Sequence, residues 1–149
     1  MNNDESLKLE NQLCFRLYSL TKLMNRHYSP VLKTLGLTYS QYLVMLVLWE
    51  QSNLVSSISV KSLGQALDLD SGTLSPLLKR LEKQELLTRV RNARDERSVE
   101  IALTKTGLQL KEQAKDIPKQ LFSVTGMSIE ELSTFKNQLD NLIETMSTS

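Results

Sequence analysis

The 149-residue sequence has very few residues that bind metals or form cross-links. It contains one cysteine, Cys14, and one histidine, His27. One cysteine excludes a disulfide within the chain and a zinc site built from several cysteines, and one histidine leaves too few ligands for a structural metal. We therefore expect no metal and no other cofactor, so any chemistry of Cys14 must come from that thiol alone.

The sequence also lacks a long apolar run. No segment reaches the roughly 18 apolar residues that a membrane-spanning helix needs, and residues 1–10 lack the basic and then apolar pattern of a secretion signal. Hydrophobic residues make up 40% and charged residues 23%, which excludes a disordered acidic chain. These properties predict a cytoplasmic globular protein with no membrane partner.

An excess of charge of one sign is absent from the chain as a whole, because 18 basic and 17 acidic residues give a net charge of +1. Residues 79–97, however, carry seven basic and four acidic side chains, a local net charge of +3. The basic side chains are Lys79, Arg80, Lys83, Arg89, Arg91, Arg94 and Arg97. Such a patch indicates either a solvated surface or a nucleic-acid site.

Apolar periodicity predicts helices in the first third of the chain. Leu7–Tyr28 reads as one helix, which ends before Pro30 because the residue that precedes proline disfavours helical dihedral angles. Thr38 and Gln41 have the spacing of a capping box and start a second helix, Tyr39–Gln51. Because this helix is apolar on nearly every face, we expect it to be buried.

The middle of the chain has the pattern of a helix-turn-helix motif. Ser59 caps a short helix, Val60–Leu67, and Asp70 or Ser71 caps a longer one that extends to about Gln84. A second helix after so short a turn is placed to enter a DNA major groove. Its outward-facing residues are Thr73, Ser75, Pro76, Lys79, Arg80 and Lys83.

Apolar residues alternate from Leu86 and again over Val99–Leu103, which predicts two strands joined by the charged tip 92–97. A helix-turn-helix followed at once by a basic hairpin is a winged helix-turn-helix. We therefore expect a mainly α-helical fold with a small β-hairpin wing. Arg89 lies near the base of this hairpin, where Glu100 would face it.

The C-terminal part predicts a helix over about 106–122, bent at Pro118, and a last helix that starts with a capping box of Ser128 and Glu131. Both terminal regions carry apolar stripes that the winged-helix module alone cannot cover, so we expect them to form a homodimer interface. The expected N-terminal dimerisation helix, DNA-binding domain and C-terminal dimerisation helices span residues 1–36, 37–104 and 105–149.

A two-fold dimer would present two recognition helices to double-stranded DNA with a pseudo-palindromic operator sequence. Hydroxyls and cations of the helix can meet phosphates or base edges, and an arginine of the wing can enter the minor groove. The candidate DNA-contacting residues are Ser71, Thr73, Ser75, Pro76, Lys79, Arg80, Arg89, Arg91, Arg94, Asp95 and Arg97. A winged helix that binds another protein is the alternative.

Cys14 lies on the first expected helix, where a lone cysteine is either a small buried hydrophobe or a reactive sensor. Tyr18 lies one turn away on the same side, and its hydroxyl can donate to a thiolate. Tyr28 lies on the same stripe but about 21 Å further along a straight helix. It can therefore reach only the Cys14 of another chain.

Four segments together resemble the MarR family of winged-helix regulators and, within it, the sensors of organic hydroperoxides and thiol oxidation. These segments are 12–15 (QLCF), 37–42 (LTYSQY), 69–82 (LDSGTLSPLLKRLE) and 95–97 (DER). The resemblance covers about residues 10–118. It implies a homodimeric transcriptional regulator that releases DNA when it is oxidised.

The resemblance also implies roles for particular residues. Cys14 corresponds to the peroxide-sensing cysteine, and Tyr28 and Tyr39 correspond to tyrosines that bond the reduced cysteine across the dimer. Arg97 corresponds to the minor-groove arginine of the wing, oriented by Asp95. This sequence lacks the second cysteine of some members, so oxidised Cys14 is expected to pair with a low-molecular-weight thiol or to oxidise further.

Two other functions compete with this hypothesis. A regulator of the same type can be released by a small aromatic or phenolic effector, and the response of a Cys14→Ser protein separates that case from redox sensing. A single-cysteine peroxidase would need a histidine or arginine motif near the thiol, which the sequence lacks. The leading hypothesis is a regulator without catalytic activity, whose partners are DNA, a second copy of the chain, oxidants and low-molecular-weight thiols.

Overall fold

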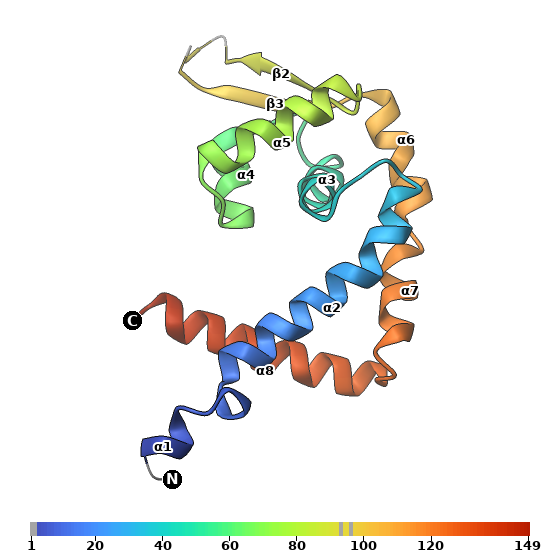
Figure 1. Ribbon diagram of the computed structural model, residues 1–149. Coiled ribbons are helices and arrows are strands. Elements are labelled where there is room, and N and C mark those ends of the chain that lie inside the picture. Colours follow the sequence, from blue (N-terminus) through green and yellow to red (C-terminus); the bar gives the residue numbers. More distant parts are fainter. Residues whose placement is uncertain (1–2, 93, 96) are drawn as a thin grey trace. The chain divides into compact units, whose positions relative to one another are not determined.

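The computed structural model describes residues 3–92, 94–95 and 97–149 (Figure 1). Contacts group the chain into two compact units, Met1–Lys115 and Asp116–Ser149. The elements of the first unit are α1 (Asn3–Ser6), the 3-10 turn η1 (Leu9–Asn11), α2 (Leu13–Lys33), α3 (Tyr39–Gln51), β1 (Ile58–Ser59), α4 (Val60–Leu67), α5 (Ser71–Lys83), β2 (Leu87–Arg91), β3 (Val99–Leu103) and α6 (Lys105–Ala114). Those of the second unit are α7 (Ile117–Val124) and α8 (Ile129–Ser147). No helix of the described ranges is long and apolar enough to cross a membrane.

Helix α3 lies at the centre of the first unit and contacts α2, α4, α5, α6 and β3 (Figure 1). The predicted capping box is present, because Thr38 and Gln41 exchange backbone and side-chain hydrogen bonds. At the other end, Trp49 Nε1 donates to the carbonyl oxygen of Gly107 at 2.9 Å. The side chains of α3 that are at most 4% exposed are Gln41, Tyr42, Val44, Met45, Leu48 and Trp49. The expected burial of this helix is confirmed for most of its apolar side chains, whereas Leu46 is 39% exposed.

Helices α4 and α5 form the predicted helix-turn-helix. Ser59 caps α4, and Asp70, rather than Ser71, caps α5. A Cβ at Gly64 would lie 2.7 Å from the carbonyl oxygen of Leu69, so only glycine lets the turn pass this close to α4. The inward face of α5 is apolar and buried, as expected.

The C-terminal end of α5 is hydrogen-bonded to the segment that precedes α3. Gln84 Nε2 donates to the carbonyl oxygen of Gly36 at 2.7 Å, and Gln41 Nε2 donates to Gln84 Oε1 at 3.4 Å. Gln41 is 4% exposed, and its side-chain amide therefore depends for hydrogen bonding on Gln84 and on the backbone amide of Thr38. Gly36 has a φ of 71°, a left-handed conformation that glycine adopts without strain.

The wing is a three-stranded antiparallel sheet in the order β1-β3-β2. The predicted hairpin pairs β2 with β3, with Leu87 opposite Leu103 and Arg91 opposite Val99. Strand β1 was not predicted, because two residues are too short to show an alternating pattern. A mainly α-helical fold with a small β-sheet wing is confirmed.

The predicted start of the N-terminal helix at Leu7 is wrong. The backbone is extended at Gln12, with φ −89° and ψ 117°, and α2 begins at the next residue. The Gln12 side-chain amide donates to the carbonyl oxygens of Ser6 and Lys8, at 2.7 and 2.9 Å. These hydrogen bonds give partners to two carbonyl oxygens just before the break that precedes α2. Apolar periodicity alone does not reveal this break.

The predicted end of that helix is also wrong, because α2 continues through Pro30 to Lys33. Proline removes one helical hydrogen bond. Continuation of the helix places Leu32 in a fully buried position, at 0% exposure. Burial of such a side chain contributes roughly 1.5 to 3 kcal/mol, enough to offset the lost bond.

The region predicted as one bent helix over 106–122 is interrupted between Ala114 and Ile117. Pro118 lies in the first turn of α7, where its missing amide costs no helical hydrogen bond. The capping box of Ser128 and Glu131 is present at the start of α8.

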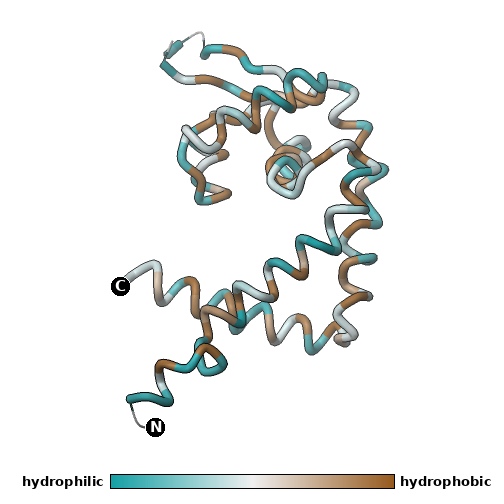
Figure 2. The backbone as a smooth tube through the Cα atoms, in the orientation of Figure 1, coloured by the Kyte–Doolittle hydropathy of each residue, from teal (hydrophilic) through white to brown (hydrophobic). Residues whose placement is uncertain are grey.

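Along α8, apolar residues recur about once in each helical turn, with polar residues between them (Figure 2). Much of its apolar surface is exposed: Ile143 is 63% and Met146 is 68% accessible. Such a stripe is typical of a helix that packs against a further surface.

We expect Gly107→Ala to lower the free energy of unfolding by at least about 2 kcal/mol, because a Cβ there would overlap the carbonyl oxygen of Leu86. Gly72→Ala is the control, since its Cβ would meet only the side chain of Asp70, at 3.3 Å. It should change stability by less than about 1 kcal/mol. Urea unfolding followed by circular dichroism measures both; equal stability of the two variants would contradict the packing described at Gly107.

Candidate nucleic-acid interface and thiol site

The start of α5 is fixed by its cap. Asp70 Oδ1 accepts a hydrogen bond from the Thr73 amide at 2.7 Å. The amide of Thr73, which donates to the carboxylate, lowers the pKa of Asp70 below its ordinary value. Ser71 and Thr73 are exposed on this first turn, and Ser75 is partly buried beside them.

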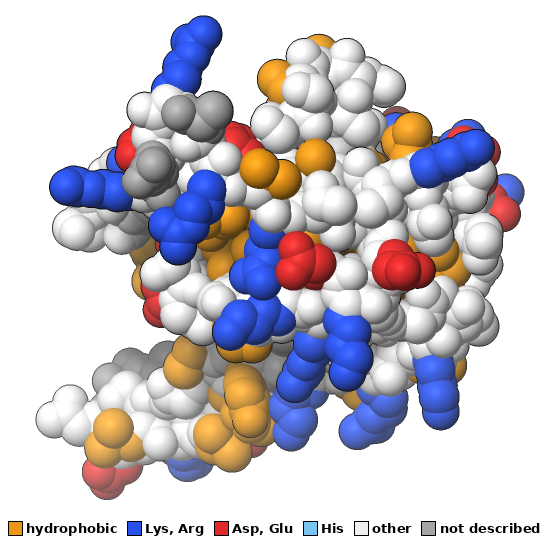
Figure 3. Space-filling view, turned by 90° about the horizontal axis from the view of Figure 1, so that it is seen from above, with side chains coloured by type: hydrophobic (Ala, Val, Ile, Leu, Met, Phe, Trp, Pro, Cys, Tyr) orange, Lys and Arg blue, Asp and Glu red, His pale blue; other side chains and the backbone are white. Residues whose placement is uncertain are grey.

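The rest of the outward face of α5 is as the sequence predicted. Pro76, Lys79 and Arg80 are exposed, whereas the side chains that hold the helix on the core, Leu74, Leu78 and Leu81, are at most 1% accessible. Lys and Arg side chains gather over this face and around the wing in a view from above (Figure 3).

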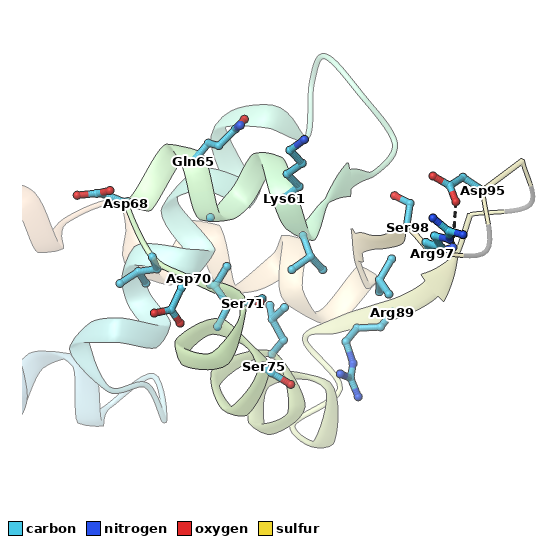
Figure 4. Close-up of a pocket in the computed structure, with 16 residues that line it drawn as sticks. Lys61, Gln65, Asp68, Asp70, Ser71, Ser75, Arg89, Asp95, Arg97 and Ser98 are labelled. Atoms are coloured by element: carbon cyan, nitrogen blue, oxygen red, sulfur yellow. Dashed lines mark hydrogen bonds between the residues drawn. The ribbon is translucent and has the colours of Figure 1, made fainter. Parts of the chain in front are cut away.

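Side-chain hydrogen bonds shape the described part of the wing tip. Asp95 Oδ1 accepts from the Arg97 amide at 3.0 Å, so the carboxylate holds the backbone that carries this arginine (Figure 4). Asn92 Oδ1 accepts from the Arg94 amide at 2.8 Å. Arg94, Asp95 and Arg97 are all exposed. Two residues of the predicted tip, 93 and 96, lie outside the described part of the chain.

Arg89 and Arg91 lie on β2 and differ in their surroundings. Arg89 is partly buried and pairs with Glu82 of α5, not with Glu100 as the sequence suggested: its Nη2 and Nε lie 3.1 and 3.3 Å from Glu82 Oε1. The Arg89 guanidinium lowers the pKa of Glu82. Glu100 instead accepts from the side chain of Asn92 at 3.2 Å. Arg91 is exposed.

The Glu82–Arg89 pair therefore joins the recognition helix to the wing. The signal was present in the sequence as opposite charges seven residues apart across the turn between α5 and β2. Because the chain reverses there, periodicity within one element could not reveal the pair.

A groove of about 1090 Å³ runs between α4, α5 and the wing (Figure 4). It brings together several of the predicted residues, namely Ser71, Ser75, Arg89, Asp95 and Arg97. The groove also contains four polar residues that no sequence pattern singled out, namely Lys61 and Gln65 of α4, Asp68 at its C-terminal end and Ser98 of the wing. In helix-turn-helix proteins the first helix of the motif crosses the DNA backbone.

Cys14 is exposed and lies in the first turn of α2. The structure does not bring it together with Tyr28, which is fourteen residues, or about 21 Å, further along the same helix. Tyr18 is 62% exposed, and the ammonium group of Lys22 lies 5.2 Å from the centre of its ring.

Four aromatic side chains form a cluster between α2 and α3. The Tyr28 ring lies 5.1 Å from that of Tyr39 and 5.8 Å from that of Tyr42, whose ring in turn lies 6.4 Å from Trp49. Burial raises the pKa of Tyr28, and burial raises that of Tyr42 to about 12. These two phenols are therefore protonated hydrogen-bond donors at neutral pH.

An exposed recognition helix with hydroxyls and cations, beside a basic wing, defines a winged-helix transcriptional regulator. The profile of the family described as Transcriptional regulator SarA/Rot matches residues 26–114. The chain is 48% identical to the organic hydroperoxide resistance transcriptional regulator of Bacillus subtilis (strain 168) over 145 residues, 97% of this chain and 96% of that protein. It belongs to this MarR-like family of transcriptional regulators, which confirms the resemblance seen in the sequence.

Solved structures of AbfR, a protein of Staphylococcus epidermidis, have the same fold. Reduced AbfR bound to DNA is 36% identical, with a TM-score of 0.78, and the match covers 99% of this chain and 98% of that one. Overoxidised AbfR bound to DNA is 35% identical, with a TM-score of 0.76 and coverage of 97% and 99%.

Stability should fall in acid partly through Asp70 and Glu82. Their pKa values are lower in the folded chain, so their stabilising contribution is complete above the unfolded pKa and is lost as pH falls through the folded pKa. We expect Asp70→Asn, which keeps an acceptor for Thr73 but does not titrate, to show a shallower decrease of Tm below pH 5 than the wild type.

The matched control is Asp116→Asn. Asp116 also occupies an N-cap position, that of α7, but its side chain forms no capping hydrogen bond. Its variant should retain the wild-type dependence of Tm on pH. Identical curves for all three proteins would show that the α5 cap does not contribute to acid sensitivity.

Proposed function

We propose that this chain is a cytoplasmic, homodimeric transcriptional regulator that binds DNA when reduced and releases it when organic hydroperoxides oxidise Cys14. It would act by changing its affinity for DNA, without catalytic turnover. The observation that carries the proposal is a single exposed thiol on a winged-helix scaffold that is 48% identical to a regulator named for organic hydroperoxide resistance.

The DNA-binding part of the proposal assigns the operator contacts to α5 and the wing. The exposed residues of α5 would enter the major groove, and Arg97, held by Asp95, would enter the minor groove. Residues 37–104 would form this module, and 1–36 and 105–149 would dimerise. Exposed apolar residues at both ends, such as Leu13 at 62% and Met146 at 68%, support an interface with a second copy.

The sensing part of the proposal needs a donor to stabilise the thiolate of Cys14. A free thiol, with a pKa of about 8.5, is only a few per cent ionised at pH 7. Tyr28 and Tyr39 would supply hydroxyl donors, and the distance along α2 requires Tyr28 to come from the other subunit. Their rings are packed together on α2 and α3, which holds the hydroxyls in place.

The oxidised state that releases DNA would carry added bulk at the sulfur. AbfR has been solved on DNA in an overoxidised form, so in that protein the added oxygens are compatible with binding. Each chain contains one cysteine, so no second thiol of the same chain is available, and a mixed disulfide with a low-molecular-weight thiol would supply the added bulk.

Organic hydroperoxide together with a small thiol should abolish binding to a palindromic operator duplex, whereas Cys14→Ser should bind equally well and no longer respond. Gel shifts of both proteins with the same oxidant dose measure this, and intact mass identifies the adduct. If that dose also releases the Cys14→Ser protein from the duplex, Cys14 is not the sensor. If an aromatic effector alone releases the wild-type protein, a ligand-controlled regulator is favoured.

Arg97→Ala should weaken DNA binding by about tenfold or more, and more than Arg89→Ala, because Arg89 is already paired with Glu82. If each subunit neutralises about four phosphates, log affinity should fall against log salt with a slope of about −7. Fluorescence anisotropy across a salt series gives both quantities. A slope shallower than about −2 would instead favour a winged helix that binds protein.

A further inference from the structure

A second groove, of about 680 Å³, lies on the first unit and shares no lining residue with the groove between α4, α5 and the wing. It is lined by the C-terminal half of α2 and by the segment that leads into α3. Its lining residues are Lys22, Asn25, Arg26, Ser29, Lys33, Gly36, Leu37, Thr38 and Tyr39. All three charged residues of the lining are cations, and none is a carboxylate.

The positive charge of this groove is not compensated locally. Residues 11–49 contain no aspartate or glutamate at all, although they carry four lysines and arginines. No ion pair of the described residues involves Lys22, Arg26 or Lys33. Three cations with no ion pair to a carboxylate among the described residues focus a positive potential on whatever enters the groove they surround.

The start of α3 adds to this potential. Thr38 caps the helix, and the amides of the following residues, Tyr39 and Ser40, belong to the first turn, which has no acceptors within the helix. The N-terminal end of a helix carries a partial positive charge and favours anions. Two independent features, the cations of α2 and the end of α3, therefore converge on the same groove.

Tyr39 connects this groove with the thiol chemistry, because it both lines the groove and packs on Tyr28. We infer that the groove binds the carboxylate of a small reactant and places its reactive end beside the Cys14 that Tyr28 and Tyr39 contact in the dimer. The reactant is a carboxylate-bearing low-molecular-weight thiol. This inference rests on the proposed function for the reactive cysteine and for its contact with Tyr28 and Tyr39 in the dimer; anion binding by the groove does not depend on it.

The reaction has two balanced steps. The Cys14 thiolate attacks the hydroperoxide, the O–O bond breaks, one oxygen passes to sulfur, and the alkoxide leaves as an alcohol after taking up a proton. The thiol then attacks the sulfenic sulfur. An S–S bond forms, the S–O bond breaks, and the hydroxide leaves with the thiol proton as water. The groove acts in the second step by raising the local concentration of the anionic thiol.

Anion binding can be tested without redox chemistry. In the dimeric Cys14→Ser protein, titration with propionate should shift the amide NMR signals of Ser29 and Tyr39. The shifts should vanish in Lys22→Gln/Arg26→Gln and persist in Lys61→Gln, which removes an exposed lysine from α4. If propionate leaves these amides unchanged or shifts them equally in both variants, the groove is not an anion site, whatever the role of Cys14.

The kinetic test compares two thiols of equal size, 3-mercaptopropionate and 3-mercaptopropanol. After oxidation by a neutral hydroperoxide, intact mass should show the mixed disulfide forming at least about fivefold faster with the carboxylate, an advantage lost in Lys22→Gln/Arg26→Gln. It should also be lost at 1 M salt, where the Debye length is about 3 Å. Equal rates of the two thiols in the wild type would overturn the assignment to the thiol.

A third arm separates the thiol from the oxidant, which can also carry a carboxylate. Loss of the free thiol is followed with a carboxylated and a neutral hydroperoxide of similar size. A preference for the carboxylated hydroperoxide, with equal rates for the two thiols, would assign the groove to the oxidant and overturn its assignment to the thiol. Failure of every hydroperoxide to modify Cys14 would refute the proposed function while leaving the propionate titration to decide on the groove.

Discussion

The burial of α3 is the constraint on which the first unit depends. A helix that is apolar on most faces is stabilised by neighbours that cover those faces, and Val44 and Met45 are fully buried. Helices α2, α4, α5 and α6 and strand β3 all contact it. At its N-terminal end the capping box of Thr38 satisfies the free amides, and at its C-terminal end the carbonyl oxygen of Trp49 accepts from Ser52 Oγ and Lys111 Nζ. The recognition helix and the wing are thus positioned by the same packing that removes α3 from water.

The sequence predicted correctly those helix starts that are set by a capping side chain and the few residues after it. The caps at Ser59, Asp70 and Ser128 are where the sequence places them, because a capping side chain needs only the next three residues. The limits of α2 could not be predicted in this way. Its start depends on hydrogen bonds from the Gln12 side chain to carbonyl oxygens of an earlier turn. Its continuation through Pro30 depends on the burial of Leu32.

In the candidate site, too, the sequence predicts features set within one element but not contacts between elements. Helical periodicity was sufficient to place Lys79 and Arg80 outward on α5. The partner of Arg89 was missed because it comes from a different element, and the register of β2 and β3 aligns Glu100 with Val90 instead. Local patterns therefore predict which face a residue occupies, but pairing across elements requires the fold.

The hydrogen bonds of Gln84 make the C-terminal end of α5 a pivot. This end is tied to Gly36 and Gln41, immediately beside Tyr39, whereas the opposite end carries the residues of the recognition surface. Thirteen residues give the helix a lever arm of about 20 Å, so a tilt of about 5° at the pivot displaces Ser71 by about 1.7 Å. That displacement exceeds the range over which a hydrogen bond holds. Any tilt of α5 about this end would therefore be magnified at the far end of the helix.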